Sequence, residues 1–274
     1  MAAKKTPPTP EQALAAAADL PPGLRRLEAL AAIAGDEGKA GRTEEAARIL
    51  ADALQTAREL KDSAAKAQGL ARLACEFSRL GQRYAAAGLT GESTEIAEKL
   101  AAPHDRAFAL IGIAREFGRD GQRDVSLKNL SQALTVAPLI SEPHRRAAVF
   151  TRVAEQYLDE GQKDLARELL PQAQAAAGET ASPEERSWLF IKIGDCGRRC
   201  GREILAPEML AEAYRAALTI SDASDRSRRM AVISCKYTEI RRYDAALDVA
   251  RLISVESYRA MALYFISARY TQSE

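Results

Sequence analysis

The cysteines are the residues whose spacing comes nearest to a metal or redox site. Cys196 and Cys200 are four residues apart, which would place both thiols on one face of a helix. A closed zinc site needs four ligands, and neither histidine, His104 or His144, is near them in the sequence. We therefore interpret all four cysteines as small packing residues and expect no metal site.

Catalytic motifs are missing from the sequence. It has no Gly-x-x-x-x-Gly-Lys-Ser/Thr loop, no Gly-x-Gly-x-x-Gly fingerprint and no His-Glu-x-x-His pair. The stretch from Gly35 to Lys39 lacks the spacing, the Ser/Thr and the preceding strand of a phosphate loop, and it is better explained as a helix end running into a turn. Only two histidines could act as bases near neutral pH. We predict a protein that is not an enzyme and carries no cofactor.

The chain is built from blocks of 40 residues without insertion or deletion between them. Six blocks begin at Leu27, Ala67, Ala107, Ala147, Ser187 and Ser227. Their fifteenth position is glycine in five blocks and Arg241 in the sixth. The eighth and twentieth positions are Ala, Gly or Ser throughout. A fixed period in this range indicates stacked supersecondary units rather than a closed globule.

Each block predicts two antiparallel helices joined by a tight turn. In the third block, Leu110, Ile113, Ala114 and Phe117 follow the i, i+3, i+4, i+7 spacing of one helix face. Glycine at the fifteenth position would supply the left-handed conformation that ends this helix. A second periodic run follows it. Prolines recur between blocks, where they would end one helix and begin the next.

Composition fits a soluble protein of a reducing compartment. Charged residues make up 28% of the chain but the net charge is only +1, which argues against a surface that is basic throughout and binds nucleic acid. The cysteines have no disulfide-framework spacing, and the first ten residues contain no apolar run typical of a secretory signal. No stretch approaches 18 uninterrupted apolar residues. We expect a cytoplasmic protein with no membrane segment.

The pattern within a block resembles the tetratricopeptide repeat (TPR). In the fourth block the corresponding residues are Phe150, Val153, Ala154, Tyr157 and Ala166. This resemblance implies an all-α fold, an α-solenoid of helix-turn-helix repeats wound as a right-handed superhelix. HEAT repeats and Sel1-like repeats have similar lengths, but the proline inside the first helix and the Gly-x-Gly turn that mark them are missing.

Three features depart from the TPR pattern. These blocks are six residues longer than the 34 of the family. Glu37 and Gly197 replace the expected aromatic residue, and Arg241 replaces the turn glycine. The longer unit affects the expected pitch of the superhelix and leaves the expected fold unchanged.

The domain organisation follows from the register. We expect a disordered tail at residues 1–10, a capping helix with its linker at 11–26, and a solenoid at 27–270. The repeats would be 27–66, 67–106, 107–146, 147–186, 187–226 and 227–259, followed by a terminal capping helix at 260–270.

In the family that the chain resembles, the first helices line a concave groove that holds a partner peptide or helix. The residues off the core stripe, at positions 2, 5, 6, 9, 12 and 13 of each block, would face this groove. The predicted partner-binding residues are Arg72, Arg79, Phe108, Arg115, Arg119, Arg152, Trp188, Lys192, Arg198 and Arg199. Only Glu155, Asp159 and Asp195 oppose them in charge, so we predict a basic groove with aromatic anchors that suits an acidic ligand. The alternative is that these cations form a solvated face with local ion pairs.

The last helix carries apolar residues on several sides. Leu263, Ile266 and Tyr270 would form its core face, whereas Met261, Tyr264 and Phe265 could mediate self-association as a homodimer. The alternative is ordinary exposure of apolar residues.

We therefore predict a non-catalytic scaffold or adaptor that binds a protein or peptide of acidic character in a basic concave groove. Single-stranded RNA or another polyanion along the same groove is the first alternative. Self-assembly through the C-terminal helix is the second.

Overall fold

The computed structural model of the chain describes residues 9–61 and 63–271, and all regular structure among them is helical. Contacts divide these residues into two compact units on either side of the Val136–Ala137 bond. We call them unit 1 and unit 2 and describe each by itself. The predicted tail at 1–10 lies outside the described residues except for Thr9 and Pro10, which begin the first helix.

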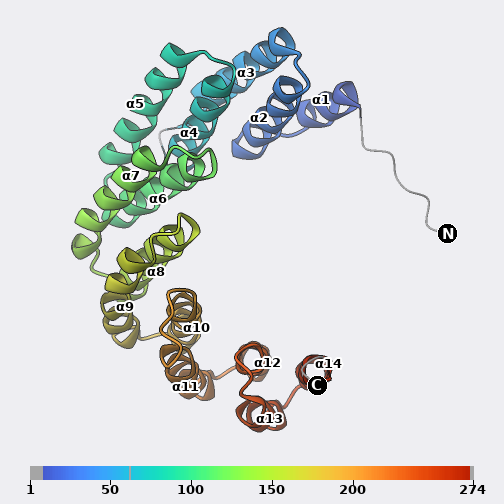
Figure 1. The fold of residues 1–274 in the computed structure, drawn as a ribbon, viewed down its shortest axis with the longest axis vertical. Helices are drawn as coiled ribbons and strands as arrows, with labels where there is room; N and C mark the ends of the chain where they lie inside the picture. Colours follow the sequence, from blue (N-terminus) through green and yellow to red (C-terminus); the bar gives the residue numbers. More distant parts are fainter. Residues whose placement is uncertain (1–8, 62, 272–274) are drawn as a thin grey trace, which may run out of the picture. The chain divides into compact units, whose positions relative to one another are not determined.

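Unit 1 consists of one leading helix and three helix pairs (Figure 1). The helices are α1 (Pro10–Ala18), α2 (Leu24–Lys39), α3 (Thr43–Arg58), α4 (Ala64–Arg79), α5 (Arg83–Lys99), α6 (Pro103–Arg119) and α7 (Arg123–Val136). The pairs are α2–α3, α4–α5 and α6–α7, and α1 packs on α2.

Unit 2 consists of three pairs and one closing helix. A 3-10 turn, η1 (Ala137–Leu139), precedes them. The helices are α8 (Pro143–Asp159), α9 (Lys163–Gly178), α10 (Pro183–Arg199), α11 (Leu205–Leu218), α12 (Ala223–Glu239), α13 (Tyr243–Arg251) and α14 (Glu256–Tyr270). The pairs are α8–α9, α10–α11 and α12–α13, and α14 packs on α12 and α13.

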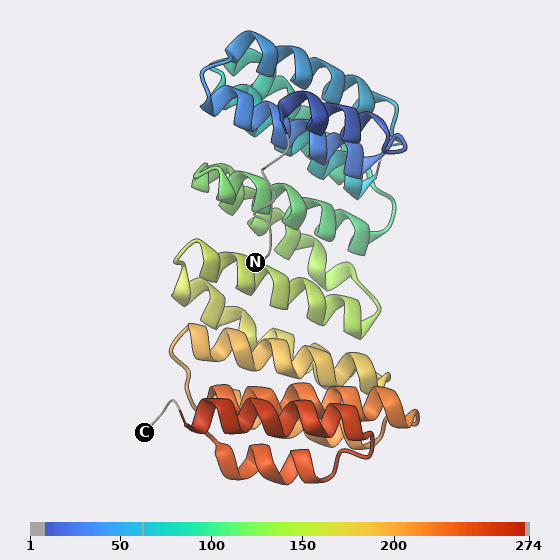
Figure 2. The ribbon, with the colours of Figure 1, turned by 90° about the vertical axis from the view of Figure 1, so that its right-hand side faces the viewer.

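Within each unit the first helices of successive pairs lie side by side (Figures 1 and 2). Each second helix packs on its own first helix and on the first helix of the next pair. The first helices therefore form one layer and the second helices another. This stacking of neighbours confirms, in each unit, the predicted all-α solenoid of helix-turn-helix repeats.

The turn between the two helices of a pair has the same backbone conformation in all six repeats. The five glycines at the fifteenth position have φ between 75° and 80°, and Arg241 has φ 59°. The left-handed region costs an L-residue about 1–2 kcal/mol, because its Cβ approaches the following carbonyl oxygen. The turn is thus required by the repeat, and Arg241 adopts it at a cost.

This geometry predicts stability changes of opposite sign at two equivalent positions. We expect Arg241→Gly to raise the free energy of unfolding by about 1 kcal/mol and Gly121→Ala to lower it by about as much. A Cβ at Gly121 would meet no atom within 4 Å, so its cost is conformational and not steric. Urea denaturation followed by circular dichroism measures both changes. Two changes of the same sign would contradict this account of the turn.

Small residues at the eighth and twentieth positions meet where the two helices of a pair cross. The Ser234 hydroxyl donates a hydrogen bond to the carbonyl oxygen of Ala246 at 2.9 Å. A Cβ on Gly194 would lie 3.4 Å from the carbonyl oxygen of Ala206. These contacts join the eighth position of one helix to the twentieth position of its partner, so the close approach depends on small side chains.

We expect Ala154→Leu or Ala166→Leu to destabilise unit 2 by about 1–3 kcal/mol, because both residues are fully buried at such a crossing. Ala175→Leu is the matched control, since Ala175 lies exposed on the same helix as Ala166. Thermal unfolding measures all three. Unchanged melting temperatures for both buried variants would refute the pairing.

Two repeats lack the aromatic residue at the eleventh position, and in each of them neighbouring side chains fill the space of the ring. The buried Glu37 carboxylate accepts hydrogen bonds from the Arg42 guanidinium, from Nε to Oε2 and from Nη2 to Oε1 at 2.8 Å. A Cβ on Gly197 would lie only 2.7 Å from Cδ2 of Leu205, so Leu205 fills the space of the missing ring. Both changes keep the interior of the repeat filled, one with an ion pair and one with a leucine.

Candidate functional site

The predicted groove arginines of unit 1 surround a buried carboxylate. Glu116, on α6, lies 3.6 Å from Nη1 of Arg72 and 3.7 Å from both Nε of Arg115 and Nη1 of Arg119. The Gln68 side-chain amide also donates a hydrogen bond to Oε1 of Glu116 at 3.2 Å. One buried negative charge therefore compensates three of the cations that the sequence placed in the groove.

Arg79 is paired in the same way. Its Nη1 lies 2.7 Å from the buried Glu76, and its Nε lies 2.6 Å from Asp120, the residue that caps the C-terminus of α6. Glu76 and Glu116 occupy the tenth position and Asp120 the fourteenth. Both positions lie outside the expected groove stripe, so the predicted charge of the groove did not include these acids. In unit 1 the first-helix layer is thus far less basic than its arginines alone indicate.

Unit 2 has ion pairs that join successive first helices. Lys192 Nζ lies 3.0 Å from Glu155, Arg199 Nη2 2.5 Å from Asp159, and Lys236 Nζ 3.1 Å from Asp195. Such exposed or half-exposed pairs contribute about 0–1 kcal/mol each and exchange readily with other partners. For Lys192 and Arg199, these pairs agree with the alternative prediction that the cations form a solvated face with local ion pairs.

Trp188 is the centre of a second arrangement on the same layer. It lies on α10 and is 42% exposed. Nζ of Lys192 lies 5.4 Å from the centroid of the indole ring, and Cζ of Arg229, on α12, lies 5.1 Å from it. Both distances are within the range of cation–π interaction. Trp188 and Lys192 were predicted from the sequence, and the structure brings Arg229 to them.

Arg229 is a half-buried cation without an ion-pair partner among the described residues. Its Nη2 donates to the carbonyl oxygen of Glu184 at 3.3 Å, but its Nε is buried and has no acceptor. Burial lowers the pKa of Arg229, the neighbouring Arg228 lowers it further, and Asp225 and Glu184 act in the opposite direction. A desolvated guanidinium with an unused donor favours binding of an external anion.

The sequence argument missed Arg229 because it lies at the third position of its block. The residues at this position in the other five blocks are Ala29, Gly69, Ala109, Val149 and Leu189. A single charged residue in an otherwise small or apolar column is a signal that could have identified it.

The remaining predicted groove residues are spread over both units. Arg198 and Arg152 are exposed on α10 and α8 of unit 2, and Phe108 is half-buried on α6 of unit 1. We call Trp188, Lys192 and Arg229 the Trp188 cluster.

The exposed face of α14 differs from the expected one. Ala262 and Ile266 are buried, whereas Leu263 is 40% and Tyr270 51% exposed, so the predicted core face holds only at Ile266. In the other repeats the second helix covers the equivalent side, and the described residues contain no second helix after α14. Met261 and Tyr264 are exposed, and Phe265 is half-buried with Cζ of Arg269 5.6 Å from its ring centroid. Self-association through them stays a prediction.

The cysteines are free and do not form a reactive cluster. Cys196 and Cys200 are buried, and the Cys200 thiol donates to the carbonyl oxygen of Cys196 at 2.9 Å. Burial raises the pKa of Cys196 to about 12, which disfavours the thiolate that metal binding or nucleophilic attack needs. Among residues 9–61 and 63–271, no three His, Cys, Asp or Glu side chains are grouped closely enough to hold a metal ion. Nor does this part of the chain contain a helix long and apolar enough to span a membrane.

Comparison with known proteins finds likeness in structure alone. The crystal structure of Ton1535 from Thermococcus onnurineus NA1 matches with a TM-score of 0.54 at 15% sequence identity, over 93% of this chain and 94% of that one. A Podosopora anserina protein with nearly identical TPR-like repeats, named for a kinesin light chain, gives a TM-score of 0.43 at 22% identity, over 73% and 99%. A Rap protein complexed with competence and sporulation factor gives 0.43 at 12%, over 90% and 80%.

No family model matches the sequence, and no curated protein matches it significantly. The match to Ton1535 extends over nearly all of both chains and supports the helical fold. The paired helices with their recurring left-handed turns confirm the TPR-like character of the repeats as a likeness of fold.

Proposed function

We propose that this chain is a non-catalytic scaffold that binds an acidic segment of a partner protein at the Trp188 cluster. The observation that carries the proposal is the half-buried Arg229, which contacts the face of an exposed tryptophan and has a buried Nε without an acceptor. Tryptophan and arginine are the residues most enriched at the energetic centres of protein interfaces.

The chemistry of the cluster favours a carboxylate next to an apolar side chain. A carboxylate can pair with the Arg229 guanidinium through charge-assisted hydrogen bonds, and it would supply the negative charge that this cation lacks among the described residues. The exposed part of Trp188 offers an apolar surface for a neighbouring side chain of the same ligand.

The ion pair between Lys192 and Glu155 does not block such binding. Both side chains are about one-third exposed, so the pair is weak and a ligand carboxylate can replace Glu155 at little cost. The partner would therefore bind by replacing Glu155 beside Lys192 and by pairing with Arg229, which has no acidic partner among the described residues.

Trp188 is the only tryptophan of the chain, so its emission reports directly on this site. We expect an Asp/Glu-rich peptide that carries one leucine to shift the Trp188 emission in a saturable manner, and a Lys-rich peptide of equal length to leave it unchanged. Arg229→Gln should weaken the acidic peptide at least about tenfold, which is 1.4 kcal/mol.

Arg228→Gln is the matched control. Arg228 is the adjacent residue, exposed and paired with Asp225, and it makes no contact with the tryptophan ring. We expect the affinity of the Arg228→Gln variant for the acidic peptide to remain within about twofold of the wild type. Equal losses for the two variants would indicate a general charge effect and refute the proposed site.

Competition with polyuridine tests whether the ligand is RNA. We expect the acidic peptide to remain bound, whereas displacement of the peptide together with a larger shift by polyuridine would favour single-stranded RNA. A pull-down from a lysate of the source cells, with and without nuclease and with Arg229→Gln as the second bait, would then identify the partner.

A further inference from the structure

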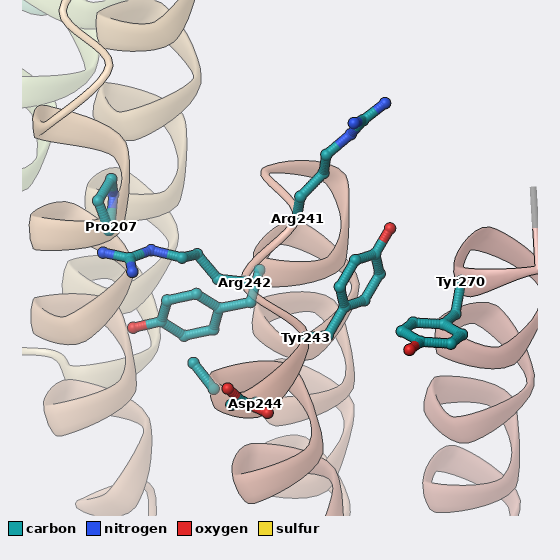
Figure 3. A pocket seen from close by; sticks show the side chains of 8 residues that line it. Pro207, Arg241, Arg242, Tyr243, Asp244 and Tyr270 are labelled. Carbon is teal, nitrogen blue, oxygen red and sulfur yellow. The ribbon is translucent and has the colours of Figure 1, made fainter. Parts of the chain in front are cut away.

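Unit 2 contains a cavity of about 600 Å³ that has no role in the proposed function. It lies where the start of α11, the turn between α12 and α13, and the last turn of α14 come together (Figure 3). Its lining residues are Pro207, Tyr237, Arg241, Arg242, Tyr243, Asp244, Ala245 and Tyr270. This volume is within the range of small-molecule sites.

Tyr237 and Arg242 form a polar end of the cavity. The equivalent pair of positions in unit 1 shows that this end lacks a carboxylate. In the first repeat, positions 11 and 16 are Glu37 and Arg42, and the carboxylate accepts two hydrogen bonds from the guanidinium. In the sixth repeat the same positions are Tyr237 and Arg242. The arginine is kept while its carboxylate is replaced by a phenol, so Arg242 has no acidic partner within its repeat.

The two polar groups at this end are available to a ligand. Tyr237 is more than nine-tenths buried and lines the cavity, and its hydroxyl has no hydrogen-bond partner among the described residues. Arg242 is exposed, forms no ion pair with any described residue, and extends toward Pro207 (Figure 3). Burial raises the pKa of Tyr237, while the charges of Arg242 and Arg215 lower it. The hydroxyl is thus a hydrogen-bond donor at neutral pH.

Other charged groups at the cavity point elsewhere. The Arg241 side chain extends away from that of Arg242, and the Asp244 carboxylate lies on the side away from the Arg242 guanidinium (Figure 3). The first turn of α13 has no side-chain cap, so its backbone N–H groups add positive potential beside Arg242.

The other end of the cavity is aromatic and apolar. The rings of Tyr243 and Tyr270 are 5.3 Å apart between centroids and nearly perpendicular at 82°. Pro207 and Ala245 add apolar surface. A planar ring can pack edge to face or stacked against such a wall.

We propose that this cavity binds a small aromatic carboxylate. Its carboxylate would accept hydrogen bonds from Arg242 and the Tyr237 hydroxyl, as the Glu37 carboxylate does from Arg42, and its ring would pack on Tyr243 and Tyr270. This site uses none of the residues of the Trp188 cluster, so its test is independent of the proposed function.

Isothermal titration calorimetry of the whole chain with three probes tests both halves of the ligand. We expect saturable binding of 3-phenylpropionate, and at least about tenfold weaker binding of acetate, which lacks the ring, and of 3-phenylpropanol, which lacks the charge. Arg242→Gln should weaken 3-phenylpropionate at least about tenfold, and Tyr237→Phe, which keeps the buried ring, about threefold or more.

Arg202→Gln is the matched control, because Arg202 occupies the sixteenth position of the preceding repeat and does not line the cavity. The Arg202→Gln variant should bind 3-phenylpropionate with the affinity of the wild type. No saturable binding of 3-phenylpropionate, or equal weakening by Arg202→Gln and Arg242→Gln, would overturn the proposal.

Discussion

Phe117→Ala is expected to lower the free energy of unfolding of unit 1 by about 3–5 kcal/mol. Phe117 is among the largest fully buried side chains of the protein and occupies the aromatic eleventh position of its repeat. Its removal leaves a cavity between helices that the glycine turn holds in place, so the gap cannot close fully. Urea denaturation followed by circular dichroism at 222 nm measures the loss.

Tyr84→Ala is the matched control, since Tyr84 is an almost fully exposed aromatic residue of the same unit. We expect its effect to remain within about 0.5 kcal/mol. Because a repeat array can unfold in parts, a separate early transition for Phe117→Ala would be consistent with loss of the repeat that contains it. Equal effects of the two substitutions would contradict the assignment of the eleventh position to the core.

Trp188→Ala is expected to weaken binding of the acidic peptide by at least about 2 kcal/mol, or roughly thirtyfold. The substitution removes the apolar anchor and also the ring face that Lys192 and Arg229 contact. Since the variant has no tryptophan, the affinity is measured by fluorescence anisotropy of a labelled peptide.

Trp188→Phe separates the two contributions of the ring. It keeps an aromatic face of smaller area, so we expect an intermediate affinity. The circular dichroism of both variants should match that of the wild type, because Trp188 is partly exposed and outside the buried core. Unchanged affinity of Trp188→Ala with intact helicity would place the binding site elsewhere on the protein.

The helices and turns of this protein could be predicted from the sequence because they depend on local chemistry repeated at one spacing. An apolar face at helical period, a small residue at the crossing and a turn residue at position fifteen act within a single block. Even Arg241 obeys the register, with a positive φ where glycine is absent. The same repetition identified Trp188 and Lys192, which stay candidates for partner binding until the peptide titration is done.

The charge of the first-helix layer could not be predicted in the same way. Glu76 and Glu116 are buried beneath the arginines of α4 and α6, and Asp120 reaches Arg79 from the next repeat. Arg72 with Glu116 and Arg79 with Asp120 are pairs about 40 positions apart, whereas Glu76 pairs with Arg79 inside one helix but outside the groove stripe. A count made along that stripe alone therefore assigns the cations no partners.

The repeat, its helix pairs and its turn geometry thus follow from the amino-acid sequence alone. The packing of the helices determines which side chains meet and which stay exposed: Leu205 fills the space left by Gly197, Arg229 packs on Trp188, and Leu263 stays exposed on α14. Periodicity fixes the backbone of each unit because every block satisfies the same local requirements. The contacts between blocks depend on individual substitutions, and their partners become adjacent only when the helices stack.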